Sequence, residues 1–349
     1  MQKGRSKILH RLLVPAFLVG SLILFLAVHF LTFLYIPPSR EEVNKVIEVQ
    51  PGATLREVAA RLSQERLITQ VPYFVLLGKL TLVERNIKPG EYAFTTQMAP
   101  LDILDALKKG KILTYELVVP EGSTADQIAH LVEAQKMADH NTFIRLVHDQ
   151  DFIRSLGLKE DSLEGYLFPD TYYFPKKIGA ADVIQTMVAK FLDTYEPELE
   201  ERAHELNMPR NKVITLASII EKETSAELER PLVSAVFHNR LKKNMPLQSD
   251  PTVIYALLPD FQGTLRKSHL KVNSPYNTYR HMGLPPGPIG NPGRESIYAA
   301  LYPEKVGYLY FVSKNDGTHY FSFTLQEHNR AVWKYQKQKS KKKLTQKDP

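Results

Sequence analysis

The longest apolar segment of the chain runs from Leu12 to Ile36 and contains no formally charged residue. At about 1.5 Å of rise per residue, a helix of this length exceeds the roughly 30 Å of a bilayer's hydrocarbon core. A cleavable signal peptide is the alternative, with an apolar core of about 7–15 residues before a small-residue cleavage site. This segment is longer, and it leads through Tyr35 into Pro37 rather than into small residues. The pattern therefore predicts an uncleaved transmembrane anchor within residues 1–36.

Charged residues flank this anchor unequally. Four basic residues precede it, namely Lys3, Arg5, Lys7 and Arg11, whereas the basic residues after it are offset by Glu41 and Glu42. The more positive flank of a membrane helix stays in the cytoplasm. We therefore expect a single-pass protein of the cell inner membrane with a cytoplasmic N-terminus. Everything after Pro37 is expected in the periplasm.

Beyond the anchor, two segments share one pattern of apolar and polar positions, VQPGATLREVAARL at 49–62 and VPEGSTADQIAHLV at 119–132. In each, an apolar strand leads through a glycine turn to a threonine suited to cap an amphipathic helix. The first unit resembles the opening of a LysM module, a small fold that binds cell-wall glycan. We place a LysM-like αβ module at residues 44–115. Two interpretations stay open: a sugar-binding LysM module, or a packing domain that shares only its topology.

The rest of the chain mixes predicted helices and strands without a strict βαβ order, which favours an α+β fold. The pattern predicts a helix over Pro100–Lys109, with Gly110 ending it. Near the C-terminus, Leu309–Val312 and His319–Phe323 flank an Asn-Asp-Gly turn, and this arrangement predicts a β-hairpin. A second, larger domain of mixed α+β structure is therefore expected at residues 116–335.

Composition narrows the function further. The chain has no cysteine, which excludes disulfides and thiolate metal sites. Its net charge of +7 comes mainly from the C-terminal segment KYQKQKSKKKLTQKDP, which holds seven lysines against one aspartate. Without that segment the chain is close to neutral, so its charge gives no reason to expect nucleic acid as a partner. Residues 336–349 are predicted to form a basic, disordered tail.

An acidic pair follows the apolar stretch Val213–Ile220 in the sequence LASIIEKETS. With a period of 3.6, Glu221 shares a helix face with the small residues Ala217 and Ser218. A carboxyl held against such an apolar face has a raised pKa, as a general acid requires. Glu223 lies about 200° away and is expected to face elsewhere. The alternative is that both carboxylates form the solvated end of a helix.

Several other catalytic motifs are absent from the sequence. It contains no phosphate-binding loop of the G-x-x-x-x-G-K-[ST] type, no H-E-x-x-H zinc helix and no G-x-S-x-G nucleophile elbow. The glycine-rich segment 283–293 reads GLPPGPIGNPG, and its prolines lack the N–H donors that a phosphate cradle uses. It predicts a rigid, shaped loop.

Six motifs in order resemble those of the YceG-like family of membrane-anchored endolytic murein transglycosylases. They are LEGYLFPDTYYFP at 163–175, ASIIEKET at 217–224, HNRL at 238–241, LQSDPTVIYAL at 247–257, NSPYNTY at 273–279 and GLPPGPIGNPG at 283–293. The resemblance extends from the anchor to about residue 335 and leaves out the basic tail. It implies non-hydrolytic cleavage of the β-1,4 bond between N-acetylmuramic acid and N-acetylglucosamine, leaving a 1,6-anhydro-muramoyl end.

The resemblance also implies roles for residues. It assigns the catalytic glutamate of the ASIIEKET motif to Glu221, which would protonate the leaving oxygen and then accept the proton of the sugar's 6-hydroxyl. Because the sugar supplies its own nucleophile, no second carboxylate is required. We expect no metal and no cofactor. The expected partners are peptidoglycan glycan strands, the cytoplasmic membrane and peptidoglycan synthases.

Residues with rings, amides and hydroxyls in the other motifs are candidates for binding sugar. They are Gln248, Ser249, Asp250, Tyr276, Asn277, Thr278, Tyr279, Glu164 and Tyr166. For each, a role in a turn or a cap is the structural alternative. Two rival functions remain: a murein hydrolase pairing Glu221 with Asp250 or Glu164, and a non-enzymatic LysM-type tether to the wall.

Overall fold

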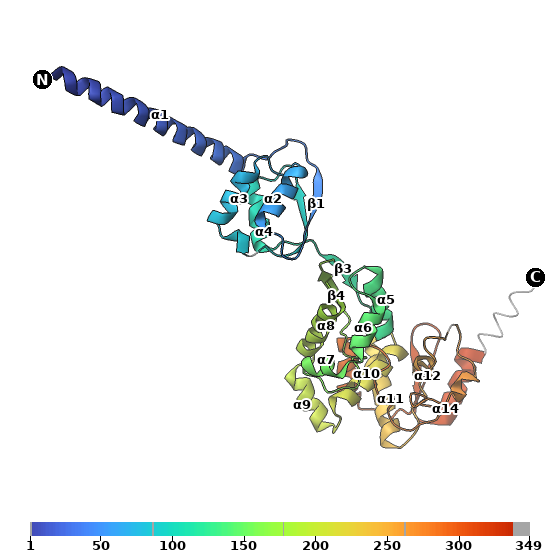
Figure 1. Cartoon of the computed structure of the whole chain (residues 1–349). Helices are drawn as coiled ribbons and strands as arrows, with labels where there is room; N and C mark the ends of the chain where they lie inside the picture. The colour runs from blue at the N-terminus through green and yellow to red at the C-terminus, as the bar shows by residue number, and fades with distance from the viewer. Residues whose placement is uncertain (1, 86, 177, 262, 338–349) are drawn as a thin grey trace, which may run out of the picture. The chain divides into compact units, whose positions relative to one another are not determined.

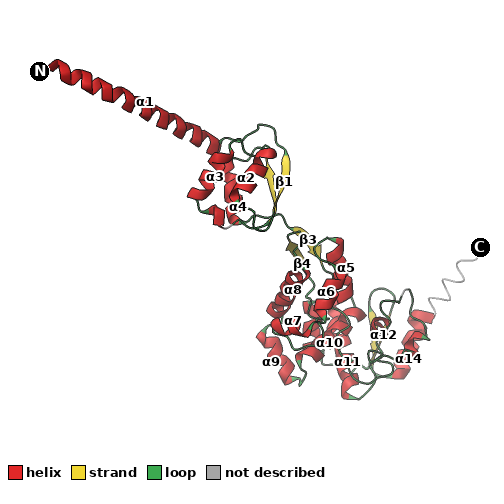
Figure 2. Cartoon of the chain, in the orientation of Figure 1, coloured by secondary structure: helices red, strands yellow, loops and turns green. Residues whose placement is uncertain are grey.

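The computed structural model describes residues 2–85, 87–176, 178–261 and 263–337 (Figure 1). The chain divides into two compact units after Tyr115. The described residues form a mixed α+β structure in which helices predominate and the strands form three two-stranded sheets (Figure 2). The predicted basic tail lies outside the described residues from 338 onward, while its first two positions belong to the helical turn Trp333–Lys337.

The first unit contains one long helix and a small αβ module. Its elements are α1 (Gln2–Tyr35), β1 (Asn44–Val49), α2 (Leu55–Gln64), α3 (Val71–Leu80), β2 (Gly90–Thr95) and α4 (Pro100–Lys109). Within α1, Val14–Tyr35 is long and apolar enough to cross a membrane, and no second such helix occurs among the described residues. The predicted apolar helix is therefore confirmed as a candidate membrane span.

Local sequence signals explain the module. β1 and β2 pair antiparallel, from Asn44 opposite Thr95 to Val49 opposite Gly90. Thr54 caps α2 in a capping box with Glu57, since each side chain bonds the other residue's backbone N–H. The helix predicted over Pro100–Lys109 is confirmed as α4. It ends at Gly110, whose φ of 64° lies in the left-handed region that glycine adopts without strain.

The second unit is larger and mostly helical. Its strands are β3 (Tyr115–Val118), β4 (Thr171–Phe174), β5 (Tyr310–Ser313) and β6 (His319–Ser322). Its helices are α5 (Ala125–Ala134), α6 (His140–Val147), α7 (Gln150–Ser155), α8 (Ala180–Thr194), α9 (Pro197–Glu205), α10 (Arg210–Glu223), α11 (Arg230–Lys242), α12 (Asp250–Ala256), α13 (Arg294–Leu301) and α14 (Leu325–Val332).

The central helix of this unit is α10. Every residue from Val213 to Ile220 is buried, so the helix is enclosed on all sides rather than on one stripe. The proline-rich segment 283–293 covers its small-residue face, where Ile289 donates its backbone N–H to the hydroxyl of Ser218 at 3.0 Å. The predicted shaped loop is thus a packing element of the core.

The predicted C-terminal hairpin is confirmed. β5 and β6 pair antiparallel from Tyr310 opposite Ser322 to Ser313 opposite His319. The hairpin is fastened to α11 because Arg240 donates from Nε to the carbonyl oxygen of Leu309 at 2.7 Å. This contact holds the hairpin beside α11.

Candidate active site

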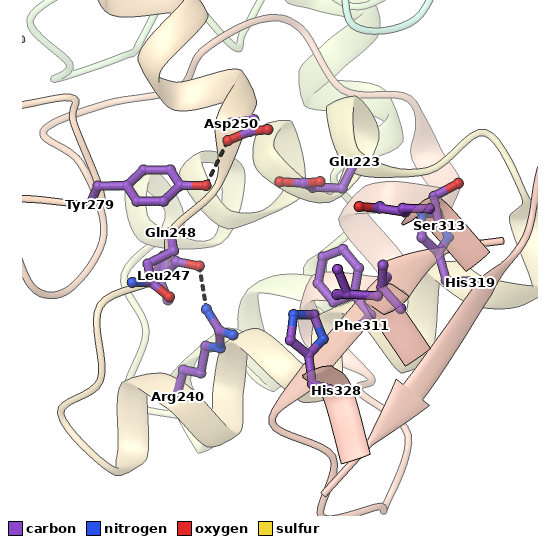
Figure 3. A pocket seen from close by; sticks show the side chains of 13 residues that line it. Glu223, Arg240, Leu247, Gln248, Asp250, Tyr279, Phe311, Ser313, His319 and His328 are labelled. Atoms are coloured by element: carbon purple, nitrogen blue, oxygen red, sulfur yellow. Dashed lines mark hydrogen bonds between the residues drawn. The ribbon is translucent and has the colours of Figure 1, made fainter. Parts of the chain in front are cut away.

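A cavity of about 390 Å³ lies in the second unit, where the end of α10 meets α11, the loop before α12, the hairpin and α14 (Figure 3). Its lining residues are Glu223, Arg240, Leu247, Gln248, Asp250, Tyr279, Phe311, Val312, Ser313, His319, His328, Val332 and Gln336. Two carboxylates, a guanidinium, two imidazoles and aromatic rings therefore face one space. This mixture suits a polar, ring-shaped ligand such as a sugar.

Glu223 is the last residue of α10, so its side chain is placed by a rigid helix. The carboxyl is partly accessible from the cavity, yet protein surrounds it, and this burial raises its pKa to about 7. The hydroxyl of Ser249 donates a hydrogen bond to its Oε1 and opposes that rise, while the negative charge of Asp250 adds to it. Glu223 can therefore hold a proton near neutral pH and release it.

The loop before α12 is held by the segment that contains Thr278. Gln248 donates its backbone N–H to the carbonyl oxygen of Thr278 at 3.1 Å, and Ser249 donates its N–H to the Thr278 hydroxyl at 3.0 Å. Gln248 has a φ of 51°, a conformation that costs a non-glycine residue energy and that this pairing maintains. The phenol of Tyr279 donates to Oδ1 of Asp250 at 2.6 Å. Two distant sequence motifs thus form one wall.

Arg240 forms the floor of the cavity. Its Nη1 donates to the carbonyl oxygen of Leu247 at 2.7 Å (Figure 3), and its guanidinium lies over the ring of Tyr310, 5.2 Å from the centroid. These contacts bury the guanidinium, a cation that remains charged under all physiological conditions. Its charge also favours the ionised form of Glu223. Arg240 therefore combines structural support with positive potential near the carboxyl.

Two histidines complete the opposite wall. The Nδ1 atom of His319 lies 2.7 Å from Oε2 of Glu229, and that carboxylate also accepts the backbone N–H of His319 at 2.9 Å. The ring of His328 stacks on Tyr310, and burial lowers its pKa. The hairpin and α14 thereby each contribute an imidazole to the cavity. A pattern within one segment of the sequence cannot reveal this, because the cavity is formed by several distant segments.

Glu221, the residue to which the family resemblance assigns catalysis, has different surroundings, and its catalytic role stays a prediction. Its carboxylate pairs with Arg230 at 3.1 Å and accepts the backbone N–H of Gly293 at 3.0 Å. Both side chains of the pair are only 6% exposed, and Glu221 does not line the cavity. The small-residue face of α10 that includes Ser218 is covered by the segment 283–293. As predicted, Glu223 faces elsewhere, but its direction is the one that meets the cavity.

The other predicted residues separate into three groups. Gln248, Asp250 and Tyr279 line the cavity with Glu223, and Ser249 bonds that carboxyl. Two more support it from behind: Asn277 is fully buried and donates to the carbonyls of Leu270 and Val272, while Thr278 holds the loop. The remaining three, Tyr276, Glu164 and Tyr166, lie outside the lining.

Glu164 lines a second cavity, of about 300 Å³, together with Tyr255. Burial raises its pKa to about 7, against the opposing hydrogen bonds from the Ala125 N–H and the Tyr255 phenol. The ring of Tyr276 lies 4.9 Å from that of Tyr255, centroid to centroid. Tyr166 is fully buried and packs edge-on against Phe191, so it is a core residue rather than a surface for sugar.

One group among the described residues could hold a metal ion, formed by Asp126, His130 and His140. Their ligand atoms lie within 4.8 Å of one another, and His140 Nε2 lies 3.0 Å from Asp126 Oδ1. None of the three lines the cavity around Glu223. This possible metal-binding group is therefore separate from Glu223 and Arg240.

The comparison with protein families decides the identity of the fold. The model of the YceG-like family matches residues 47–334. The chain belongs to the YceG-like family. The match includes every residue that lines the cavity around Glu223 except Gln336.

Known YceG-like proteins agree with this assignment. A Bacillus subtilis protein named endolytic murein transglycosylase is 33% identical over 323 residues, which cover 87% of this chain and 88% of that protein. A Streptococcus pneumoniae protein of the same name is 29% identical, over 82% of this chain and 57% of its own length. A crystal structure of a YceG-like protein from Listeria monocytogenes, 35% identical, aligns with a TM-score of 0.58 over 84% of this chain and 99% of that one.

In this member of the YceG-like family, the cavity combines a carboxyl of raised pKa with a guanidinium and aromatic rings. Glu223 can donate a proton, and the cationic floor at Arg240 and the rings of Tyr279 and Phe311 surround the space before it. Three residues that line this cavity, Glu223, Arg240 and His319, are not among the site candidates chosen from the sequence. The first two stand inside the motifs ASIIEKET and HNRL, so these motifs also contribute side chains to the cavity.

Proposed function

We propose that this chain is an endolytic murein transglycosylase in which Glu223 acts first as general acid and then as general base. The names of its relatives support the activity, and the position of Glu223 supports the residue assignment. The observation that carries the proposal is one carboxyl with a pKa of about 7 at the edge of a polar, aromatic cavity. The alternative acid is Glu221, which the family resemblance implies and which forms an ion pair with Arg230.

The proposed reaction needs one protein carboxyl. Glu223 gives its proton to the glycosidic oxygen as the bond from that oxygen to the muramoyl anomeric carbon breaks. The 6-hydroxyl oxygen of the same muramoyl residue then bonds to that carbon, and its proton passes to Glu223, which restores the starting acid. The reaction consumes no water and requires no second carboxylate, and the product carries a 1,6-anhydro end. The same residue thus serves both half-steps.

A murein hydrolase is the second candidate, because Asp250 lines the same cavity and raises the pKa of Glu223. Two carboxyls flanking one bond are the equipment of ordinary glycosidases. Digestion of purified, uncrosslinked glycan strands in ¹⁸O-labelled water separates the two. The proposal requires anhydro ends without ¹⁸O, seen by mass spectrometry, whereas reducing ends that carry the label would establish hydrolysis.

The span Val14–Tyr35 supports a membrane-anchored enzyme whose soluble part lies outside the cytoplasm. The basic residues before the span favour a cytoplasmic N-terminus, which puts the second unit in the periplasm. A reporter enzyme that is active only outside the cytoplasm, fused after Lys337, should be active in cells. A stable, membrane-inserted fusion without activity would refute this orientation and remove the wall as substrate.

The first unit is proposed to bind glycan in the manner of a LysM module. In support, its strand–turn–helix segment lines a cavity of about 420 Å³ that includes Gln50, Gly52 and Arg61. Replacing Arg61 by Ala and Gln50 by Ala should weaken binding of the full-length protein to isolated glycan strands in a sedimentation assay. Unchanged binding by the folded double variant would favour the alternative, a packing domain with LysM-like topology.

A further inference from the structure

Helix α3 exposes an apolar side on the first unit. Leu76 is 48% exposed and Leu80 is 68% exposed, and Leu82 just after the helix is 66% exposed. Phe74 and Leu77 of the same helix are buried in the module's core. A soluble protein seldom leaves a row of leucines in water, so this row calls for a covering surface.

The exposed row continues the side of α3 on which α1 lies. Tyr73 of α3 contacts two rings of α1, with centroid distances of 5.5 Å to Phe30 and 5.6 Å to Phe33. At about 100° per residue, Leu76 and Leu80 point within about 60° of the direction of Tyr73. The leucines and the contact with α1 therefore share one side of the helix.

The contact falls inside the candidate membrane span. Phe33 and Leu34 belong to the buried core of the module although they lie within Val14–Tyr35. About 20 helical residues fill a hydrocarbon core, so counting from Val14 the far boundary falls at about Phe33. The module is thus fixed at the bilayer boundary rather than held on a free linker, and Figure 1 draws α3 beside the end of α1.

We propose that α3 is a membrane-contact face, with Leu76, Leu80 and Leu82 inserted among the lipids of the leaflet where α1 ends. This proposal rests on the anchoring of α1 in the membrane. Lys79 lies beside the leucines and is exposed, and its long side chain can keep the ammonium among phospholipid head groups while its stem lies along the acyl chains. The lipid contact would fix the tilt of the module relative to the membrane. It would also fix how far from the membrane surface the chain leaves the module.

The absence of cysteine from the chain permits a direct test on the full-length protein. Single cysteines are introduced at Leu76 and Leu80, and the protein is placed as one copy per nanodisc of phosphatidylcholine and phosphatidylglycerol. The rate of reaction with a membrane-impermeant maleimide is then measured. Val46→Cys is the matched control, because Val46 is apolar and 57% exposed on β1, whose neighbouring residue Ile47 faces the core. Leu24→Cys in the middle of α1 reports insertion of the anchor.

We expect Leu76→Cys and Leu80→Cys to react roughly tenfold more slowly than Val46→Cys, since burial of one leucine suffices for that bias. Equal rates at all three positions, with Leu24→Cys protected, would overturn the membrane-contact face while leaving the anchor intact. A reactive Leu24→Cys would overturn both. Protection that appears only in discs holding several copies would assign the leucines to a second copy of the chain instead and refute the lipid contact. None of these outcomes depends on the catalytic proposal.

Discussion

The hydroxyl of Ser249 donates a hydrogen bond to Oε1 of Glu223, although 26 residues separate the two along the chain. Ser249 is almost fully buried, and its backbone N–H is fixed by the Thr278 hydroxyl, so the donor has little freedom to turn away. The bond stabilises the ionised form of a carboxyl whose surroundings favour the protonated form. Ser249 is therefore a positioning residue that sets both the direction and the proton affinity of the proposed acid.

Removing this donor should change the pH dependence of the reaction. With a pKa of about 7, wild-type Glu223 loses its proton as the pH rises through 7, and kcat/KM should fall there. Ser249→Ala removes a hydrogen bond that lowers the pKa of Glu223. The alkaline limb of the pH–rate profile should therefore move to higher pH, even if the maximal rate drops. The measurement is the pH profile of anhydro-end formation. Ser313→Ala is the control, since Ser313 lines the cavity without bonding Glu223 in the structure. An unmoved limb in Ser249→Ala would mean a purely structural role.

Replacing each of the two glutamates of α10 separately by glutamine distinguishes their roles. Glu223→Gln keeps the size of the side chain but cannot cycle a proton, and general acid–base catalysis is worth about 10²–10⁴ in rate. We therefore expect at least about a 10²-fold loss of anhydro-end formation, with thermal stability near neutral pH equal or higher. Mass spectrometry of digested strands and thermal unfolding are the two measurements.

Glu221→Gln should show the opposite result. It weakens a buried ion pair with Arg230 and should lower stability by about 1–3 kcal/mol while the folded protein stays active. A folded, stable Glu221→Gln protein without activity, beside an active Glu223→Gln protein, would return the catalytic role to Glu221.

Elements coded by neighbouring residues could be predicted from the sequence. The capping threonine of α2, the end of α4 at Gly110 and the hairpin turn depend on contacts within a few positions, and all three occur in the structure. The apolar length of the anchor is a local property too. These signals are reliable because no distant segment has to arrive for them to form.

The proposed acid could not be chosen in the same way. Periodicity separates the faces of a helix only if one face is open, whereas α10 is buried all round. The face carrying Glu221 is closed by Gly293 and Arg230, which come from segments 72 and 9 residues away in sequence. The opening before Glu223 is likewise made by distant segments, among them the hairpin with His319. Which carboxyl meets a ligand is thus a tertiary property, invisible to a pattern within one helix.

Glu164 should make the folded state sensitive to pH without taking part in catalysis. Its pKa of about 7 in the folded protein exceeds the ordinary value of 4.5, so the folded state binds the proton more tightly than the unfolded state. Its contribution is therefore greatest below pH 4.5 and is lost as the pH rises towards 7, by up to about 3 kcal/mol. Glu164→Gln should flatten the fall of unfolding free energy between pH 5 and 7.5. Denaturant unfolding at several pH values measures this, with Asp170→Asn as an exposed control. An unchanged slope would show that hydrogen bonds to the carboxylate cancel the effect of burial.

Asn291 connects two motifs that the sequence keeps more than 120 residues apart. Its Oδ1 accepts the backbone N–H groups of Gly165 and Leu167 at 2.9 and 2.8 Å, and its Nδ2 donates to the carbonyl oxygen of Ser123 at 2.8 Å and to Glu164 at 3.1 Å. The side chain is fully buried, so Asn291→Ala would leave the N–H groups of Gly165 and Leu167 without partners and without water. The Ser123 carbonyl and Glu164 would each lose one bond but keep others.

The expected cost of Asn291→Ala is about 2–5 kcal/mol of unfolding free energy, since each stranded buried group costs about 1–3 kcal/mol and relaxation recovers part of the sum. Asn291→Asp is the informative companion. It keeps an acceptor for Gly165 and Leu167 but places a second carboxyl 3.1 Å from Glu164, so its stability should recover as the pH falls and one of the two carboxyls takes up a proton. Chemical unfolding of both variants at pH 5 and pH 8 provides the comparison. If Asn291→Ala lost less than about 1 kcal/mol, the bonds of Asn291 would not be what holds the LEGYLFPD and GLPPGPIGNPG motifs together.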